Sequence, residues 1–189
     1  MGHDHENESP AAAQERAPAA AASAAVAEHR AHAPSKVACY IVTCSDSRAR
    51  ADDASGRALL EGLVRAGHPV VGQVIVQDEA DAIRGALQAA QLAGAQAVLF
   101  TGGTGLTRRD QTVDTLGPLL DRELPGFGEL FRMLSYQEIG SAAWLSRALA
   151  GTYGELLVFL LPGSPNAAKL ALEKLILPEL GHAIRELSR

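Results

Sequence analysis

The alternation of short apolar runs with amphipathic segments between residues 37 and 101 restricts the fold of this chain most. Residues 37–43, 69–76 and 97–101 are short and rich in apolar or β-branched residues, as buried strands are. The segments between them repeat apolar residues at helical spacing and end at Gly67 and Gly94. Strands and helices that alternate through short connections are typical of a parallel sheet covered by helices.

Polar residues mark where the first two helices begin. Asp53 and Ser55 are alternative N-caps of the first helix, and we expect Asp78 to cap the second. The predicted apolar face of the first helix consists of Leu59, Leu60, Leu63 and Val64. That of the second consists of Ile83, Ala86, Leu87 and Ala90.

The second half of the chain adds an antiparallel element. Residues 146–152 and 155–161 bracket Tyr153-Gly154, a plausible hairpin turn at the edge of the sheet. Helices are predicted around 113–120 and 129–134, the latter opened by the segment PGFG. The chain ends in two helices, 165–177 and 178–187, or in one that is kinked at Pro178.

Composition divides the chain near residue 35. Residues 1–35 hold 13 Ala and four of the six His but none of the eight aromatic residues, so they offer little apolar area to offset their ordering entropy. We expect a disordered tail there and no metal site. Residues 36–189 carry a net charge of −2 and suffice for one domain.

Several classes of protein are excluded by composition. No apolar run approaches the roughly 18 residues that cross a bilayer, and no basic stripe for nucleic acid is evident. The start MGHDHENE does not resemble a secretory signal. On a strand Cys39 and Cys44 would point to opposite faces, too far apart for a disulfide, so we expect core thiols in a cytoplasmic protein.

We expect the chemistry in three loops that follow predicted strands, residues 44–56, 77–79 and 101–110, because ligands bind beyond the carboxyl ends of such strands. The first of these loops is rich in serine and aspartate. In the loop TGGTGLTRRD, Gly102, Gly103 and Gly105 allow backbone N–H groups to approach an anion, and Thr104 adds a hydroxyl. Phosphate is the expected guest, although the loop lacks the lysine of a Walker A motif. A tight turn without a ligand is an equally good interpretation of this loop alone.

Asp78 and Asp110 each follow the end of a strand, and neighbouring strands lie about 5 Å apart. Two carboxylates so placed can share Mg²⁺, which commonly bridges to phosphate. The alternative makes Asp78 a helix cap and Asp110 either a surface acid or a partner for Arg108 or Arg109. No His lies near these loops, which argues against a nucleophile–base pair. We expect Trp144 to anchor either the core or a subunit contact, and His68 to lie at the surface or its boundary.

The motifs together resemble those of the MoaB/MogA family of molybdenum cofactor biosynthesis, with the segment SYQEIG closer to the MoaB branch. The similar stretches, in order over about residues 36–187, are TCSDSR, DDASG, TGGTGLTRRDQT, PGFGELFRMLSYQEIGSAAWLSRALAG and LLPGSP. The resemblance implies a three-layer α/β/α sandwich, mostly parallel with an antiparallel edge hairpin. It also implies assembly as a trimer or hexamer.

Active members of the family adenylylate molybdopterin with Mg-ATP and release pyrophosphate. By resemblance, Asp78 and Asp110 would be the catalytic, metal-binding acids. The residues that would bind substrate or nucleotide are Ser45, Asp46, Thr101, Gly102, Gly103, Thr104, Gly105, Glu129, Arg132, Pro162, Gly163 and Ser164. The alternatives are a non-catalytic pterin- or nucleotide-binding paralogue in the same pathway and, less favoured, a mononucleotide-binding regulatory module.

Overall fold

The computed structural model describes residues 33–46 and 52–189. The predicted tail, with His3, His5, His29 and His32, therefore lies almost entirely outside the described residues. So does the middle of the serine- and aspartate-rich loop that follows the first strand. Pro34–Arg189 forms one compact unit with its own sheet and helices.

A six-stranded mixed sheet forms the middle of this unit, in the order β2-β1-β3-β6-β5-β4. Four strands are parallel: β2 (Val70–Val76), β1 (Cys39–Cys44), β3 (Ala97–Thr101) and β6 (Leu156–Leu161). The other two, β5 (Leu149–Tyr153) and β4 (Arg122–Glu123), are antiparallel. The predicted parallel sheet and its antiparallel edge hairpin are thus confirmed.

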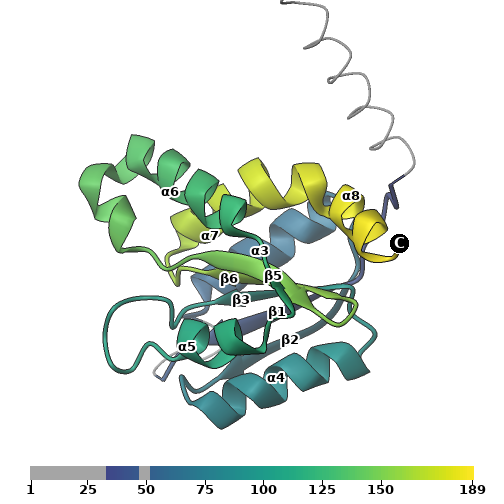
Figure 1. Cartoon of the computed structure of the whole chain (residues 1–189), viewed down its shortest axis with the longest axis horizontal. Helices are drawn as coiled ribbons and strands as arrows, with labels where there is room; N and C mark the ends of the chain where they lie inside the picture. Colours follow the sequence, from purple (N-terminus) through teal and green to yellow (C-terminus); the bar gives the residue numbers. More distant parts are fainter. Residues whose placement is uncertain (1–32, 47–51) are drawn as a thin grey trace, which may run out of the picture. The chain divides into compact units, whose positions relative to one another are not determined.

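Helices cover both faces of the sheet (Figure 1), which confirms the three-layer α/β/α architecture. One face carries α3 (Ala54–Arg65), α6 (Pro125–Ile139), α7 (Pro165–Ala171) and α8 (Leu177–Leu187). The other carries α4 (Ala80–Leu92) and α5 (Thr112–Leu116). Each layer of helices encloses its own apolar core against the sheet. Among the described residues, no helix is both long and apolar enough to span a membrane.

The two cysteines lie in different cores, because successive side chains of a strand point to opposite faces. Cys39 belongs to the core beneath α3, and Cys44 to the core beneath α4. Both are free and buried, as predicted. Burial raises the pKa of each thiol to about 12, so both stay neutral at physiological pH.

Asp53, rather than Ser55, caps α3. Its carboxylate accepts the N–H of Gly56 at 2.8 Å and the hydroxyl of Thr43 at 2.7 Å. Leu59 and Leu63 are fully buried as predicted, but Val64 is 59% exposed because it lies on the outer side of the helix. The apolar face predicted for α3 therefore included one residue too many, Val64.

Asp78 does not cap α4, which corrects the sequence prediction. The N-cap is Glu79, whose side chain makes no capping hydrogen bond. Asp78 lies one residue further out and uses its carboxylate across the loop to Gln111. The predicted apolar face of α4 is nevertheless buried as a whole.

Proline positions explain the other differences. The helix predicted over 113–120 is α5 followed by the 3₁₀ segment η2 (Gly117–Leu119), which contains Pro118. α6 begins at Pro125, earlier than predicted, because proline suits the first helical turn. The C-terminal helices are joined by a π segment, η4 (Leu172–Ile176), just before Pro178. A wider turn there relieves the clash that a proline ring makes with the preceding helical turn.

Of the two alternatives for Trp144 only the subunit contact is left, and His68 lies elsewhere than expected. Trp144, in the 3₁₀ segment η3 (Gly140–Leu145), is 72% exposed and therefore does not anchor the core. His68, expected at the surface or boundary, is buried, and its Nδ1 accepts the N–H of Val37 at 3.1 Å.

Candidate functional site

A cavity of about 540 Å³ lies where the carboxyl ends of the parallel strands meet. Hydrogen bonds join the loops around it: Ser45 N–H donates to Val76 O, and Gly102 N–H donates to Leu161 O. The predicted residues that line it are Ser45, Asp46, Asp78, Gly102, Gly103, Thr104, Gly105, Asp110, Pro162 and Gly163. Cys44, Leu145 and Ser146 also line it and were not predicted.

The glycine loop requires glycine at two positions. Gly102 and Gly103 have φ angles of 98° and 64°, in the left-handed region that side chains disfavour. A Cβ atom at Gly102 would collide with the carbonyl oxygen of Cys44, and one at Gly103 with the Asp78 carboxylate. The loop thus lets the backbone approach both β1 and Asp78 closely.

Asp78 connects three of the loops. Its Oδ1 accepts the N–H of Gln111 at 3.0 Å, and its own N–H donates to Asp46 Oδ1 at 3.1 Å. Asp46 in turn forms an ion pair with Arg109 at 2.8 Å. Burial raises the pKa of Asp78, and the negative charges of Asp110 and Asp46 raise it further against the lowering effects of Gln111 and Arg109.

Asp110 organises the turn in which it lies. Its Oδ2 accepts the N–H of Thr107 at 2.8 Å and the hydroxyl of Thr107 at 2.6 Å. Partial burial acts to raise the pKa of Asp110, but the hydrogen bonds from Thr107 and the Gly105 N–H, with the charge of Arg147, bring the pKa below its usual value. The side chain of Asp110 therefore stays ionised at neutral pH.

The two acids fit a divalent cation. Repulsion between Asp78 and Asp110 is one cause of the raised pKa of Asp78, and a cation held by both would cancel it. Among the residues that the structure describes, no three His, Cys, Asp or Glu side chains are grouped to enclose a metal. Two carboxylates at an open cavity are the protein contribution typical of Mg²⁺, which takes its other ligands from water and phosphate.

Four residues implied by the resemblance lie outside the cavity lining. Thr101 is fully buried and donates its hydroxyl to Pro162 O at 2.9 Å. Ser164 is the N-cap of α7. Glu129 and Arg132 lie on α6 and line a second hollow of about 280 Å³, where Arg132 donates to Ala148 O at 3.2 Å.

Sequence reasoning missed the residues that support the acids. Thr107 donates to Asp110. Arg109, considered above as a partner of Asp110, pairs instead with Asp46, and Arg147 donates to two carbonyls of the turn between residues 105 and 110. The segment TGGTGLTRRD contains the first two, so proximity along the chain was a usable signal. Arg147 follows this segment by 37 residues and carried no such signal.

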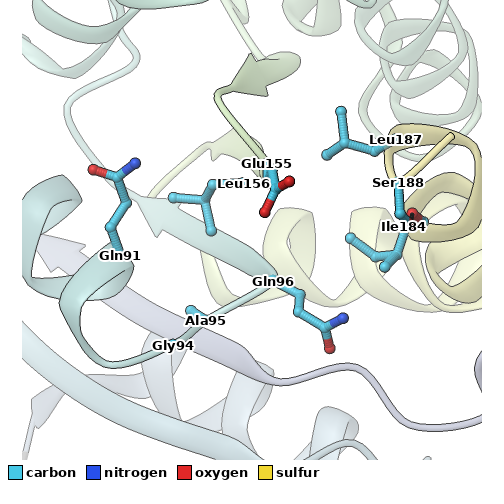
Figure 2. A pocket seen from close by; sticks show the side chains of 9 residues that line it. All are labelled: Gln91, Gly94, Ala95, Gln96, Glu155, Leu156, Ile184, Leu187 and Ser188. Carbon is cyan, nitrogen blue, oxygen red and sulfur yellow. Dashed lines mark hydrogen bonds between the residues drawn. The ribbon is translucent and has the colours of Figure 1, made fainter.

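A hollow of about 520 Å³ lies at the opposite ends of β3 and β6 (Figure 2). Gln96 and Glu155 enter it from just before these two strands, and Leu187 and Ser188 from the end of α8. Among the described residues that line it, Glu155 is the only charged one. This hollow lacks the paired aspartates, the glycine loop and the carboxyl strand ends of the first cavity. We therefore take the first cavity as the candidate site.

Comparison with known proteins agrees with this architecture. Residues 40–182 match the family model described as "Probable molybdopterin binding domain". A curated relative, molybdenum cofactor biosynthesis protein B from Bacillus cereus, is 51% identical in an alignment of 170 residues that covers 87% of this chain and 98% of the relative.

Solved structures give the same result. A crystal structure of molybdenum cofactor biosynthesis protein B aligns with a TM-score of 0.80 at 51% identity, covering 84% of this chain and 99% of that one. The tungsten cofactor synthesizing protein MoaB from Pyrococcus furiosus aligns with a TM-score of 0.78 at 40% identity, covering 83% of this chain and 100% of that one.

Proposed function

Since this chain belongs to the molybdopterin-binding family of molybdenum cofactor biosynthesis proteins, we propose that it adenylylates molybdopterin with Mg-ATP. The supporting observation is the convergence of Asp78, Asp110 and the glycine loop on one cavity. Oxygen ligands for a cation and a backbone able to approach phosphate are the parts that phosphoryl-type transfer requires.

In the proposed reaction, the terminal phosphate oxygen of molybdopterin attacks the α-phosphorus of ATP. The bond from that phosphorus to the oxygen bridging the β-phosphate breaks, and pyrophosphate leaves. Asp78 and Asp110 would hold Mg²⁺, which would supply positive charge to the phosphates. Gly102 and Gly105 already donate their N–H groups to Leu161 O and to the Asp110 carboxylate, so Gly103 and Thr104 would supply the backbone N–H groups that place the nucleotide.

The cavity favours direct transfer over a covalent protein intermediate. Cys44 is the only thiol that lines it, and burial raises its pKa to about 12, so no thiolate is present to act as a nucleophile. No histidine in the described part of the chain lines it either. The protein therefore contributes orientation and charge, which adenylyl transfer between two bound phosphates needs.

The second candidate is a non-catalytic pterin- or nucleotide-binding paralogue. The observation that favours it is the use of the Asp110 carboxylate inside its own turn, where Thr107 and Gly105 donate to it. A carboxylate offers about four acceptor positions, so these three bonds leave room for one further ligand. The enzyme hypothesis needs the remaining acceptor position of Asp110 to bind Mg²⁺, whereas the binding hypothesis does not need it.

An assay with purified protein, molybdopterin and Mg-ATP distinguishes the two. We expect adenylylated molybdopterin and pyrophosphate in equal amounts, and neither product when Mg²⁺ is removed with a chelator. Binding of molybdopterin without any pyrophosphate would instead establish the non-catalytic paralogue.

We further propose a cytoplasmic homo-oligomer, a trimer or hexamer. Two buried, unpaired thiols suit a reducing compartment. Large apolar side chains are exposed along α6 and η3, and such patches are typical of subunit contacts. We call them the α6–η3 patch: Leu130, Met133, Tyr136, Ile139 and Trp144.

A further inference from the structure

Arg147 binds the turn between Gly105 and Asp110 from outside the cavity. It lies between η3 and β5, with its side chain about 29% exposed. Its Nε donates to Gly105 O at 2.9 Å, and its Nη2 donates to Asp110 O at 3.1 Å. One guanidinium therefore connects the carbonyls at both ends of the turn.

Asp114 fixes the guanidinium itself. Nη1 of Arg147 donates to both carboxylate oxygens of Asp114, at 2.8 and 3.0 Å. All three guanidinium nitrogens are thus bonded to oxygens of the protein. This arginine is oriented by its partners and has its fork directed at the turn, not into the cavity.

The contact with Asp110 O reaches Asp78 through one peptide group. The carbonyl of Asp110 and the N–H of Gln111 belong to the same planar trans peptide, so they point in opposite directions. The carbonyl accepts from Arg147, and the N–H donates to Asp78 Oδ1 at 3.0 Å. Fixing one side of this peptide fixes the other, and a donor on the carbonyl also polarises the N–H.

We propose that Arg147 is a positioning residue that orients both Asp78 and Asp110 through the peptide between Asp110 and Gln111. The expected effect on catalysis rests on the adenylyl transfer proposed above. The hydrogen bond from Arg147 to Asp110 O, in contrast, exists in the protein without any ligand. Lysine cannot replace it fully, because a single ammonium lacks the planar fork that reaches both carbonyls and Asp114.

The test compares Arg147→Gln and Arg147→Lys with the control Arg84→Gln. Arg84 also pairs with an aspartate, Asp81 at 2.9 Å, but lies on the exposed side of α4 away from the turn. The first readout is amide hydrogen exchange of Gln111, measured by NMR without any ligand. We expect exchange to accelerate about tenfold in Arg147→Gln, less in Arg147→Lys, and not at all in Arg84→Gln.

The second readout is steady-state pyrophosphate release with molybdopterin and Mg-ATP. Since a misplaced catalytic group costs rate, we expect kcat to fall about tenfold to a hundredfold in Arg147→Gln, with the KM for ATP changed less than about twofold. Arg147→Lys should recover part of the loss. An unchanged kcat, or a rise in KM alone, would overturn the catalytic part of the proposal.

Amide hydrogen exchange at Gln111 tests the positioning role of Arg147 without depending on pyrophosphate release. Unchanged exchange at Gln111, or acceleration spread equally over β5 and α6 with a lowered melting temperature, would overturn that role. If the wild-type protein releases no pyrophosphate, the proposed function fails, while faster exchange confined to residues 105–111 would still support the hold of Arg147 on the turn.

Discussion

Asp78 is the single residue on which the proposed metal site depends most. Its Oδ1 accepts the N–H of Gln111, while among the described residues no donor bonds to its Oδ2. Asp78→Asn keeps an acceptor for Gln111 but removes the charge. We expect pyrophosphate release to fall at least about a hundredfold with little change in melting temperature. Asp81→Asn on α4 is the matched control, and an equal loss there would contradict the role of Asp78.

His68 makes stability depend on pH. Burial lowers the pKa of His68, and its Nδ1 accepts the Val37 N–H, which requires the neutral ring. As pH falls below the ordinary value near 6.5, the unfolded chain binds a proton that the folded protein does not, so folding loses stability. Urea midpoints should therefore be lower at pH 5.5 than at pH 7.5, and His68→Gln should reduce this difference. A full difference in His68→Gln would refute the assignment.

At the scale of helices, replacing two helical glycines by alanine should have opposite effects on the free energy of unfolding. A Cβ at Gly62 in α3 would overlap the buried side chain of Leu172, whereas one at Gly85 in α4 meets no atom of the described residues within 4 Å. We expect Gly62→Ala to lower the free energy of unfolding by about 1 kcal/mol through overpacking. Gly85→Ala should raise it by about 0.5–1 kcal/mol. Urea unfolding of both variants checks the signs; stabilisation by Gly62→Ala would show that α3 is free to move.

The sheet was the most predictable part of the fold. Apolar runs predicted β3 to the residue and β1 and β2 to within two residues, because buried parallel strands need near-continuous apolar sequence. Helix ends were less predictable. The π segment η4 depends on how Pro178 packs against the preceding turn, and the N-cap at Glu79 depends on what Asp78 contacts across the loop.

The candidate site was predictable where it follows strand ends and not where tertiary contacts build it. Asp78, Asp110 and the glycine loop each follow a strand, so topology alone brings them to one edge. The contact of Arg147 with Asp110 depends on how η3 and β5 pack beside the turn. Glu129 and Arg132 are adjacent to that region but face a separate hollow, which no linear motif distinguishes from the cavity.

At the scale of the whole chain, we expect residues 1–35 to be dispensable. Every matched motif lies beyond them, and the family model begins at residue 40. Deleting residues 1–35 should change neither the melting temperature nor the oligomeric mass, because such a composition contributes little apolar area to folding. Calorimetry and light scattering measure both; a truncated protein that ran as a monomer beside an oligomeric full chain would show that this segment takes part in assembly.

The α6–η3 patch is the surface that we expect to form the subunit contact. Met133 and Trp144 are 54% and 72% exposed, and exposed apolar area of this kind is stabilised when a second copy covers it. The double variant Met133→Glu, Trp144→Glu should run in light scattering as a 19.8 kDa monomer, since two buried carboxylates per copy would oppose association.

Leu92→Glu is the matched control for this variant. Leu92 is 90% exposed at the end of α4, outside the patch, so its replacement adds a charge without touching the proposed contact. We expect this protein to keep the oligomeric mass and melting temperature of the wild type. A double variant that stayed oligomeric, while Leu92→Glu dissociated, would move the subunit contact from α6 and η3 to the opposite face of the sheet.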